Sequence, residues 1–306
     1  MSRLCHDRPV NATAPARSRA TGTRTTRIRL DQLLVERGLA PSRARAQALL
    51  LGGRVRVGIG DAARSDRKAG DLVDPAVLVD VVLPDPYVSR GGHKLAAALD
   101  AFGLEPEGLT CLDVGASTGG FTDVLLQRGA HRVYALDVGR GQLAELLRAD
   151  ARVVSMERTN ARTLTAAALP EPVSLATIDV SFISLRLLFG PVATTFGLGG
   201  GTIVALVKPQ FEAGRGQVPG GVVRDPAIHR ATVERVVAAA EDVGLMPLDI
   251  IASPILGPEG NREFLLHLSV PAASAVKAGA ADAGGAAATA ERLADRIADV
   301  TLGDVR

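Results

Sequence analysis

The stretch CLDVGASTGGFTDVLLQRG, residues 111–129, decides the fold. It is typical of a strand, then a glycine-rich turn, then the start of a helix. Gly115 and the pair Gly119 and Gly120 allow the backbone to turn tightly and to approach a ligand closely. Asp113 ends the strand, and we expect its carboxylate to bind a cationic amine.

A second acidic residue narrows the choice of ligand. Asp137 ends the strand VYALD, 24 residues after Asp113, where a carboxylate can hold two ribose hydroxyls. Dinucleotide-binding turns follow G-x-G-x-x-G, with bare helix amides for a pyrophosphate. Here Asp-x-Gly-x-Ser-x-Gly-Gly places a carboxylate that would repel a pyrophosphate. The pattern favours S-adenosylmethionine, which carries an ammonium group, a ribose diol and no phosphate; a purely structural turn is the alternative.

Strand-like and helix-like stretches alternate after a helix expected at 94–102. The predicted strands are 111–114, 132–137, 153–156, 175–179, 202–208, 248–252 and 264–270, with helices between the first six. This pattern predicts an α/β fold with a Rossmann-like, doubly wound sheet of seven strands. Only a short loop joins the last two strands, so they must pair as an antiparallel hairpin. Such a hairpin suits a methyltransferase sheet better than a dehydrogenase sheet.

The chain divides into five parts by composition. We expect a disordered extension at 1–26, a small α+β domain at 27–83, a linker at 84–90, the large α/β domain at 91–271 and an Ala-rich tail at 272–306. In the small domain, IRLDQLLVERG predicts a helix from Ile28 that ends at Gly38. A second helix begins at or near Pro41, and strands follow at RVRVG and VLVDVVLP.

Charged residues gather at predicted strand ends. Lys208 follows an apolar strand in GTIVALVKPQFEAGRG, Asp179 ends the strand before it, Glu263 opens the last strand, and Lys94 starts a helix. Residues just beyond the carboxyl ends of such strands line the ligand crevice. A ribose hydroxyl is a weak acid that needs a base or a cation to become a nucleophile, which a lysine can supply. Singly, each residue could be a surface charge or a helix cap; the set favours sugar methylation.

The amino-terminal part is strongly basic. Residues 1–68 carry 15 Lys/Arg and 5 Asp/Glu, a net charge of +10, whereas the remainder carries 20 and 28, a net charge of −8. This asymmetry predicts a polyanionic partner. The arginines assigned to RNA phosphates are Arg27, Arg29, Arg43, Arg45, Arg54, Arg56 and Arg90; a solvated basic face is the alternative. Two cysteines exclude a disulfide framework and a cysteine metal cluster, and no stretch predicts a membrane helix.

Seven motifs together resemble one family. SRGGHKL, CLDVGASTGGFTDVLLQRGA, ALDVGRGQL, ERTNAR, DVSFISL, LVKPQFEAGRGQV and GGVVRDP are similar to motifs of the TlyA (hemolysin A) family of ribosomal RNA 2'-O-methyltransferases, over roughly residues 27–270. The resemblance implies an FtsJ-like domain whose catalytic Lys-Asp-Lys-Glu set falls on Lys94, Asp179, Lys208 and Glu263. It also implies an S-four-type RNA-binding domain and cytidine ribose methylation in large-subunit and sometimes small-subunit rRNA. Some relatives carry a linker tryptophan, where this chain reads DPYVSRGG.

The predicted cofactor-binding residues are Asp113, Gly115, Ser117, Gly119, Gly120, Phe121, Asp137, Asn160 and Asp179. Asn160 could hydrogen-bond the adenine or cap a nearby helix. Phe182 or Phe211 could stack on a flipped nucleotide or pack in the core. We expect a cytoplasmic monomer that acts on ribosomal subunits without a metal. A non-catalytic ribosome-binding factor and a membrane-active hemolysin are the alternative functions.

Overall fold

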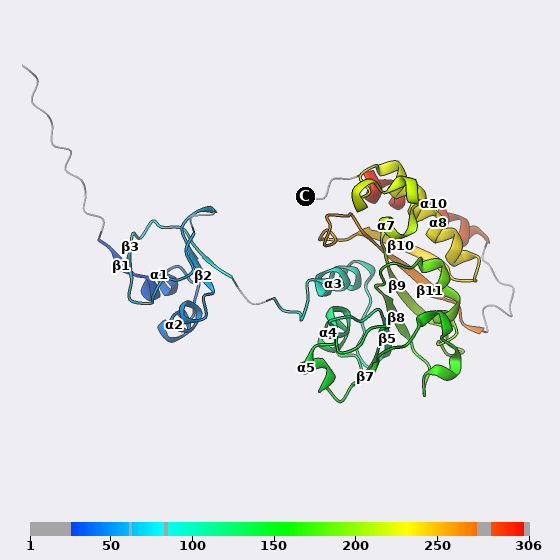
Figure 1. Cartoon of the computed structure of the whole chain (residues 1–306), viewed down its shortest axis with the longest axis horizontal. Coiled ribbons are helices and arrows are strands. Elements are labelled where there is room, and N and C mark those ends of the chain that lie inside the picture. The colour runs from blue at the N-terminus through cyan, green and yellow to red at the C-terminus, as the bar shows by residue number, and fades with distance from the viewer. Residues whose placement is uncertain (1–25, 61–62, 83–84, 274–282, 303–306) are drawn as a thin grey trace, which may run out of the picture. The chain divides into compact units, whose positions relative to one another are not determined.

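The computed structural model describes residues 26–60, 63–82, 85–273 and 283–302. They belong to two compact units, Met1–Pro84 and Asp85–Arg306 (Figure 1). Apart from residue 26, the extension predicted to be disordered lies outside the described residues.

Unit 1 is a small α+β module built around two packed helices. Its elements are β1 (Ile28–Arg29), α1 (Leu30–Glu36), α2 (Arg43–Leu51), β2 (Val55–Val57), β3 (Leu72–Val73) and β4 (Val79–Val81). Leu30, Leu34 and Leu50 are buried in its core. The predicted helix start at Ile28 is wrong, because Ile28 and Arg29 pair antiparallel with β3. A strand of only two residues is too short to show the alternating pattern by which strands are recognised in a sequence.

Unit 2 contains the glycine turn and a seven-stranded sheet. Its elements are α3 (Gly91–Phe102), β5 (Thr110–Val114), α4 (Gly120–Gln127), β6 (Arg132–Leu136), α5 (Glu145–Arg148), β7 (Val153–Met156), β8 (Leu175–Ile178), α6 (Phe189–Ala193), β9 (Gly201–Val207), α7 (Pro209–Glu212), α8 (Pro226–Glu241), β10 (Met246–Ala252), β11 (Phe264–Val270) and α10 (Ala283–Leu302). The strand order is β10-β11-β9-β8-β5-β6-β7. The predicted seven strands and antiparallel final hairpin are confirmed, and β11 lies antiparallel between β10 and β9.

Helices cover both faces of this sheet (Figure 1). One buried cluster joins the strands to α3 and α4 through residues such as Leu95 and Leu125. The other joins them to α6, α8 and α10 through residues such as Phe189 and Val236. Because both faces are buried, the strands are nearly continuous apolar runs, and polar residues concentrate at strand ends.

Two segments predicted to lie outside the large domain pack onto it. In the predicted linker, the Val88 amide donates to Asp123 Oδ2 at 2.9 Å, and the Gln127 side chain donates to the Pro86 carbonyl at 2.8 Å. In the predicted tail, Leu293 and Ile297 of α10 are buried against the core. Residues 85–90 and α10 are therefore parts of unit 2.

Candidate active site

A cavity of about 440 Å³ opens at the carboxyl ends of β5, β8 and β9. These strands are parallel neighbours, so the residues that follow Val114, Ile178 and Val207 meet at one sheet edge. The charged residues predicted to be catalytic all line this cavity: Lys94, Asp179, Lys208 and Glu263. The structure thus brings together four residues that the sequence separates by up to 169 positions.

The four charges form two short ion pairs. Lys208 Nζ lies 2.6 Å from Asp179 Oδ1 and donates to Ser181 Oγ at 3.0 Å. Lys94 Nζ lies 2.5 Å from Glu263 Oε2, and both side chains are buried. The pairing of Phe264 with Val207 places Glu263 and Lys208 at neighbouring ends of β11 and β9, so the two ion pairs lie at the same edge of the sheet. Buried cations without carboxylate partners would be costly, so each pair keeps a lysine at the cavity.

Glu212 connects the two loops that carry the Lys208–Asp179 pair, and sequence reasoning missed it. Its buried carboxylate accepts hydrogen bonds from the Ser184 hydroxyl and the Leu185 amide, each at 2.6 Å. Burial raises the pKa of Glu212 above its ordinary value, and these two donors oppose that rise. Glu212 follows Lys208 by four residues and Ser184 follows Asp179 by five, so the carboxylate fixes one loop against the other. Glu212 ends the segment PQFE, which is too short to show a helical or strand-like repeat of apolar residues.

Two aromatic side chains stand at the cavity mouth. The rings of Phe182 and Phe211 lie 4.9 Å apart, and both residues line the cavity. Phe182 has φ +66°, a left-handed conformation that is rare for a bulky residue, and it is 89% exposed. Phe182 is therefore not a core residue, which removes the packing alternative for this position.

The glycine turn packs closely against other parts of unit 2. A Cβ at Gly115 would lie 2.3 Å from the Asp179 carbonyl oxygen, and one at Gly120 would lie 2.3 Å from Ser89 Oγ. Gly115, Ser117, Gly120 and Phe121 line the cavity. Gly119 has φ +99° and packs against the side chain of Leu147, so it helps to fix the conformation of the turn. The turn therefore forms part of the wall of a cavity whose volume lies in the range of small-molecule sites.

Asp113 corrects one sequence prediction. Its carboxylate is fully buried beneath the turn and accepts hydrogen bonds from the hydroxyls of Thr122 at 2.7 Å and Thr177 at 2.9 Å. It does not line the cavity, so the predicted direct contact with an amine is absent from this geometry. The physical reason is the strand's alternation, which points Asp113 into the layer between the sheet and α4. Through the two hydroxyls Asp113 joins the end of β5 to the first turn of α4 and to β8.

We expect Asp113→Asn to flatten the pH dependence of stability. Burial raises the pKa of Asp113 from 3.8 to about 6, so between these values the folded state holds a proton that the unfolded state has released. Stability from this group therefore falls as pH rises through that window, by about 3 kcal/mol for two pKa units. Urea unfolding of both proteins at about pH 4 and pH 7 measures the difference. An equal pH dependence in the two proteins would show that Asp113 ionises normally.

Asp137 and Asn160 lie beyond the main cavity. Asp137 accepts hydrogen bonds from the Ser117 amide at 2.9 Å and the Gly139 amide at 2.7 Å, and it borders a hollow of about 10 Å³ next to the turn. Asn160 accepts a hydrogen bond from the Arg162 amide at 3.1 Å and caps a short helix. The structure therefore places Asp137 beside the glycine turn and shows the capping alternative for Asn160.

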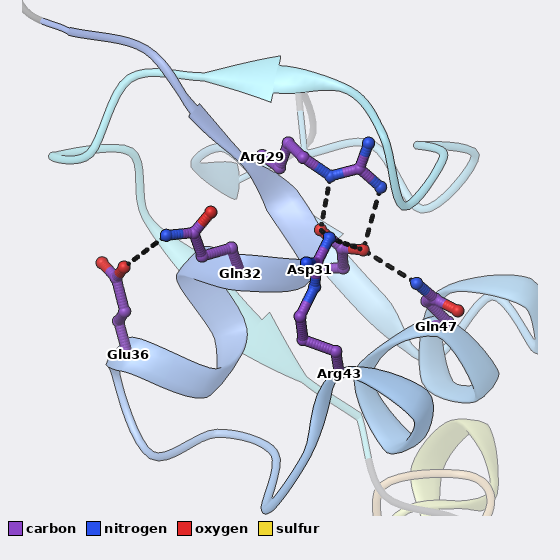
Figure 2. Close-up of polar contacts among 6 residues, drawn as sticks. All are labelled: Arg29, Asp31, Gln32, Glu36, Arg43 and Gln47. Carbon is purple, nitrogen blue, oxygen red and sulfur yellow. Dashed lines mark hydrogen bonds and ion pairs between the residues drawn. The ribbon is translucent and has the colours of Figure 1, made fainter.

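The predicted RNA-binding arginines occupy two places. Arg27, Arg29, Arg43, Arg45, Arg54 and Arg56 are exposed on unit 1, whereas Arg90 lines the cavity of unit 2. Arg29 and Arg43 both pair with a buried carboxylate, Asp31, which sequence reasoning missed (Figure 2). Within the described ranges, no helix is long and apolar enough to cross a membrane, and no three His, Cys, Asp or Glu side chains could hold a metal ion.

Known proteins share both units. A model of FtsJ-like methyltransferases matches residues 87–270, and a model of the S4 domain matches residues 28–58. The Mycobacterium tuberculosis 16S/23S rRNA (cytidine-2'-O)-methyltransferase TlyA is 48% identical over 79% of this chain and 90% of that protein. Hemolysin A of Brachyspira hyodysenteriae is 40% identical over 79% of this chain and all of that protein. A solved Streptococcus thermophilus structure, provisionally described as a hemolysin, is 40% identical, with a TM-score of 0.61 over 88% of this chain and 98% of that one.

Proposed function

This chain belongs to the TlyA family of FtsJ-like methyltransferases, and from that premise we propose that it methylates a ribose 2'-hydroxyl of ribosomal RNA. The methyl donor is S-adenosylmethionine, and the acceptor is a cytidine of large-subunit and also small-subunit rRNA, as the name of the M. tuberculosis relative states for that protein. The observation that carries the proposal is the convergence of two lysine–carboxylate pairs on one cavity beside the glycine turn.

The donor site is formed by the turn and its neighbours. We assign backbone groups of residues 115–121 to the donor and Asp137, beside the turn, to its ribose hydroxyls, while the half-buried carboxylate of Asp179 lines the same cavity as the turn. Because Asp113 is buried, Asp179 replaces it as our candidate for the donor's ammonium group. When bound, the donor supplies an electrophilic sulfonium methyl.

Lys208 is the residue that activates the acceptor hydroxyl. Its amine is oriented by Asp179 and Ser181 and reaches the cavity from the end of β9. As the hydroxyl oxygen bonds to the methyl group and the methyl–sulfur bond breaks, the hydroxyl proton leaves to solvent through the open cavity, and a cation in this position stabilises the negative charge that develops on the oxygen. Lys94 and Glu263 form a second, neighbouring ion pair whose charges balance each other.

A target nucleotide that flips out of an RNA helix loses its stacking partners, and an aromatic side chain can replace them. Phe182 presents an exposed ring at the cavity mouth, and Phe211 contacts it from α7, the short helix after Lys208. The strained backbone of Phe182 is consistent with a functional position. We therefore assign base stacking to Phe182, with Arg90 beside it for a phosphate.

Unit 1 binds folded rRNA. This binding takes place in the cytoplasm, where ribosomal subunits are found. Its exposed arginines can bind backbone phosphates of helical RNA, which is recognised by shape more than by sequence. The matching S4 domain model supports this assignment.

Labelled donor tests the function. The protein is incubated with methyl-labelled S-adenosylmethionine and, separately, with large and small ribosomal subunits. We expect label in the rRNA of at least one subunit. Donor binding and subunit binding without transfer to either subunit would favour a non-catalytic ribosome-binding factor instead.

A further inference from the structure

A buried carboxylate gathers three donors on unit 1. Asp31, in the first turn of α1, has no exposed surface. Arg29 donates to both of its oxygens, through Nε at 3.1 Å and Nη2 at 3.0 Å. Arg43 Nη2 donates at 3.2 Å and Gln47 Nε2 at 2.9 Å (Figure 2). The three donors come from β1 and α2, so the carboxylate joins elements that flank it on both sides.

Complete pairing offsets the cost of this burial. An isolated carboxylate in the core would be strongly unfavourable, and charge-assisted hydrogen bonds from arginine are the strongest compensation available. The two bonds from Arg29 hold the pKa of Asp31 well below its usual range. Asp31 therefore stays ionised at any physiological pH and is a permanent anchor for both guanidinium groups.

The anchored arginines remain open to solvent. The side chains of Arg29 and Arg43 are 44% and 55% exposed. A guanidinium has five N–H donors, and Nη1 of each arginine takes no part in the bonds to Asp31. Two cations thus share one carboxylate, keep a net charge of +1 and present unused donors at a fixed spacing.

A second arginine–carboxylate pair on the same unit serves as a comparison. Arg64 donates to both oxygens of Asp66 at 3.0 and 2.7 Å, which is the same two-bond geometry as Arg29 and Asp31. Both of these side chains are more than half exposed. Exposed pairs contribute little and do not fix a side chain, so only the buried carboxylate can act as an anchor.

We propose that Asp31 is a positioning residue that holds Arg29 and Arg43 as a clamp for a single phosphate group of the RNA backbone. The proposal rests on the proposed function only for the identity of the RNA. Anchoring lowers the entropy that each long side chain loses on binding, and two guanidinium forks suit the oxygens of one phosphate. The remaining exposed arginines of unit 1 then contribute as separate, movable charges.

Two variants with the same charge change test the clamp. Full-length Asp31→Asn and Asp66→Asn each add one positive charge to unit 1, and binding to purified large ribosomal subunits is measured without donor at several salt concentrations. Attraction by net charge alone predicts that both variants bind equally or more tightly. The clamp predicts that Asp31→Asn binds about tenfold more weakly, with a salt slope smaller by about 1, while Asp66→Asn stays within about twofold of wild type.

Circular dichroism shows whether Asp31→Asn is folded, and a less disruptive variant provides a second test. If Asp31→Asn fails to fold, Gln47→Ala removes one donor to Asp31 without changing any charge, and we expect its subunit binding to weaken about threefold. Unchanged or tighter binding by a folded Asp31→Asn, or unchanged binding by Gln47→Ala where Asp31→Asn does not fold, would overturn the proposal. Because no donor is present, these results stand apart from any failure of methyl transfer.

Discussion

Lys208→Ala is expected to lower the rate of methyl transfer to ribosomal subunits by about 10²- to 10⁴-fold while leaving the protein folded. The variant removes the only amine that contacts Asp179 among the described residues, and with it the cation that we propose acts on the acceptor hydroxyl. The side chain is truncated at the cavity surface, so no large void forms in the core. Donor binding should be retained, because the glycine turn, Asp137 and the Asp179 carboxylate all remain in the variant. Single-turnover transfer and calorimetry of donor binding measure the two effects.

Ser181→Ala provides the graded control for Lys208. It removes the second partner of the Lys208 amine, at 3.0 Å, and leaves the ion pair with Asp179 intact. We expect a loss of about tenfold, smaller than for Lys208→Ala, because one hydrogen bond from the charged amine is lost. Equal rates for wild type and Lys208→Ala would refute the assigned role of Lys208, whatever the result with Ser181→Ala.

Gly115→Ala is expected to destabilise unit 2 and to abolish donor binding. The new Cβ would lie 2.3 Å from the Asp179 carbonyl oxygen, and Gly115 has φ +86°. Neither strand can move away easily, because β5 and β8 are hydrogen-bonded neighbours in the middle of the sheet. The displacement would also shift Asp179, which pairs with Lys208. We expect a loss of at least about 3 kcal/mol, the sum of strain in the backbone and overpacking.

Gly103→Ala separates the cost of backbone strain from the cost of overpacking. Gly103 also has positive φ, at +63°, but no atom lies within 4 Å of the position of its Cβ. It should lose only about 1 kcal/mol, the cost of a left-handed alanine. Urea unfolding of both variants and donor calorimetry make the comparison. Equal losses for the two glycines would mean that the close approach at Gly115 is not a constraint.

The sheet was predictable because each of its strands is a distinct apolar run. Lys208 and Asp179 could be placed together because parallel neighbours end at one edge. The pairing of Lys94 with Glu263 was not predicted, since it depends on the insertion of β11 beside β9 and on the packing of α3. No periodicity in the sequence specifies such a contact across 169 positions.

Residues that act by holding others were the ones that sequence reasoning missed. Asp31 and Glu212 each look like an ordinary acid on a short helix, and only the fold shows that their carboxylates are buried under several donors. Asp113 was misplaced for the same reason. Its position at a strand end predicted exposure to ligand, but two threonines enclose it. Whether a given carboxylate is buried depends on how the folded chain packs. A single sequence indicates only the average tendency of each residue type to be buried.

The chemical position of the added methyl group tests the central claim most directly. Ribosomal subunits treated with donor and either wild-type protein or Lys208→Ala are digested to nucleosides, which are separated and identified by mass spectrometry. The account predicts a gain of 2'-O-methylcytidine with wild-type protein and none with the variant. A methyl group on a base, or equal 2'-O-methylcytidine with both proteins, would contradict it.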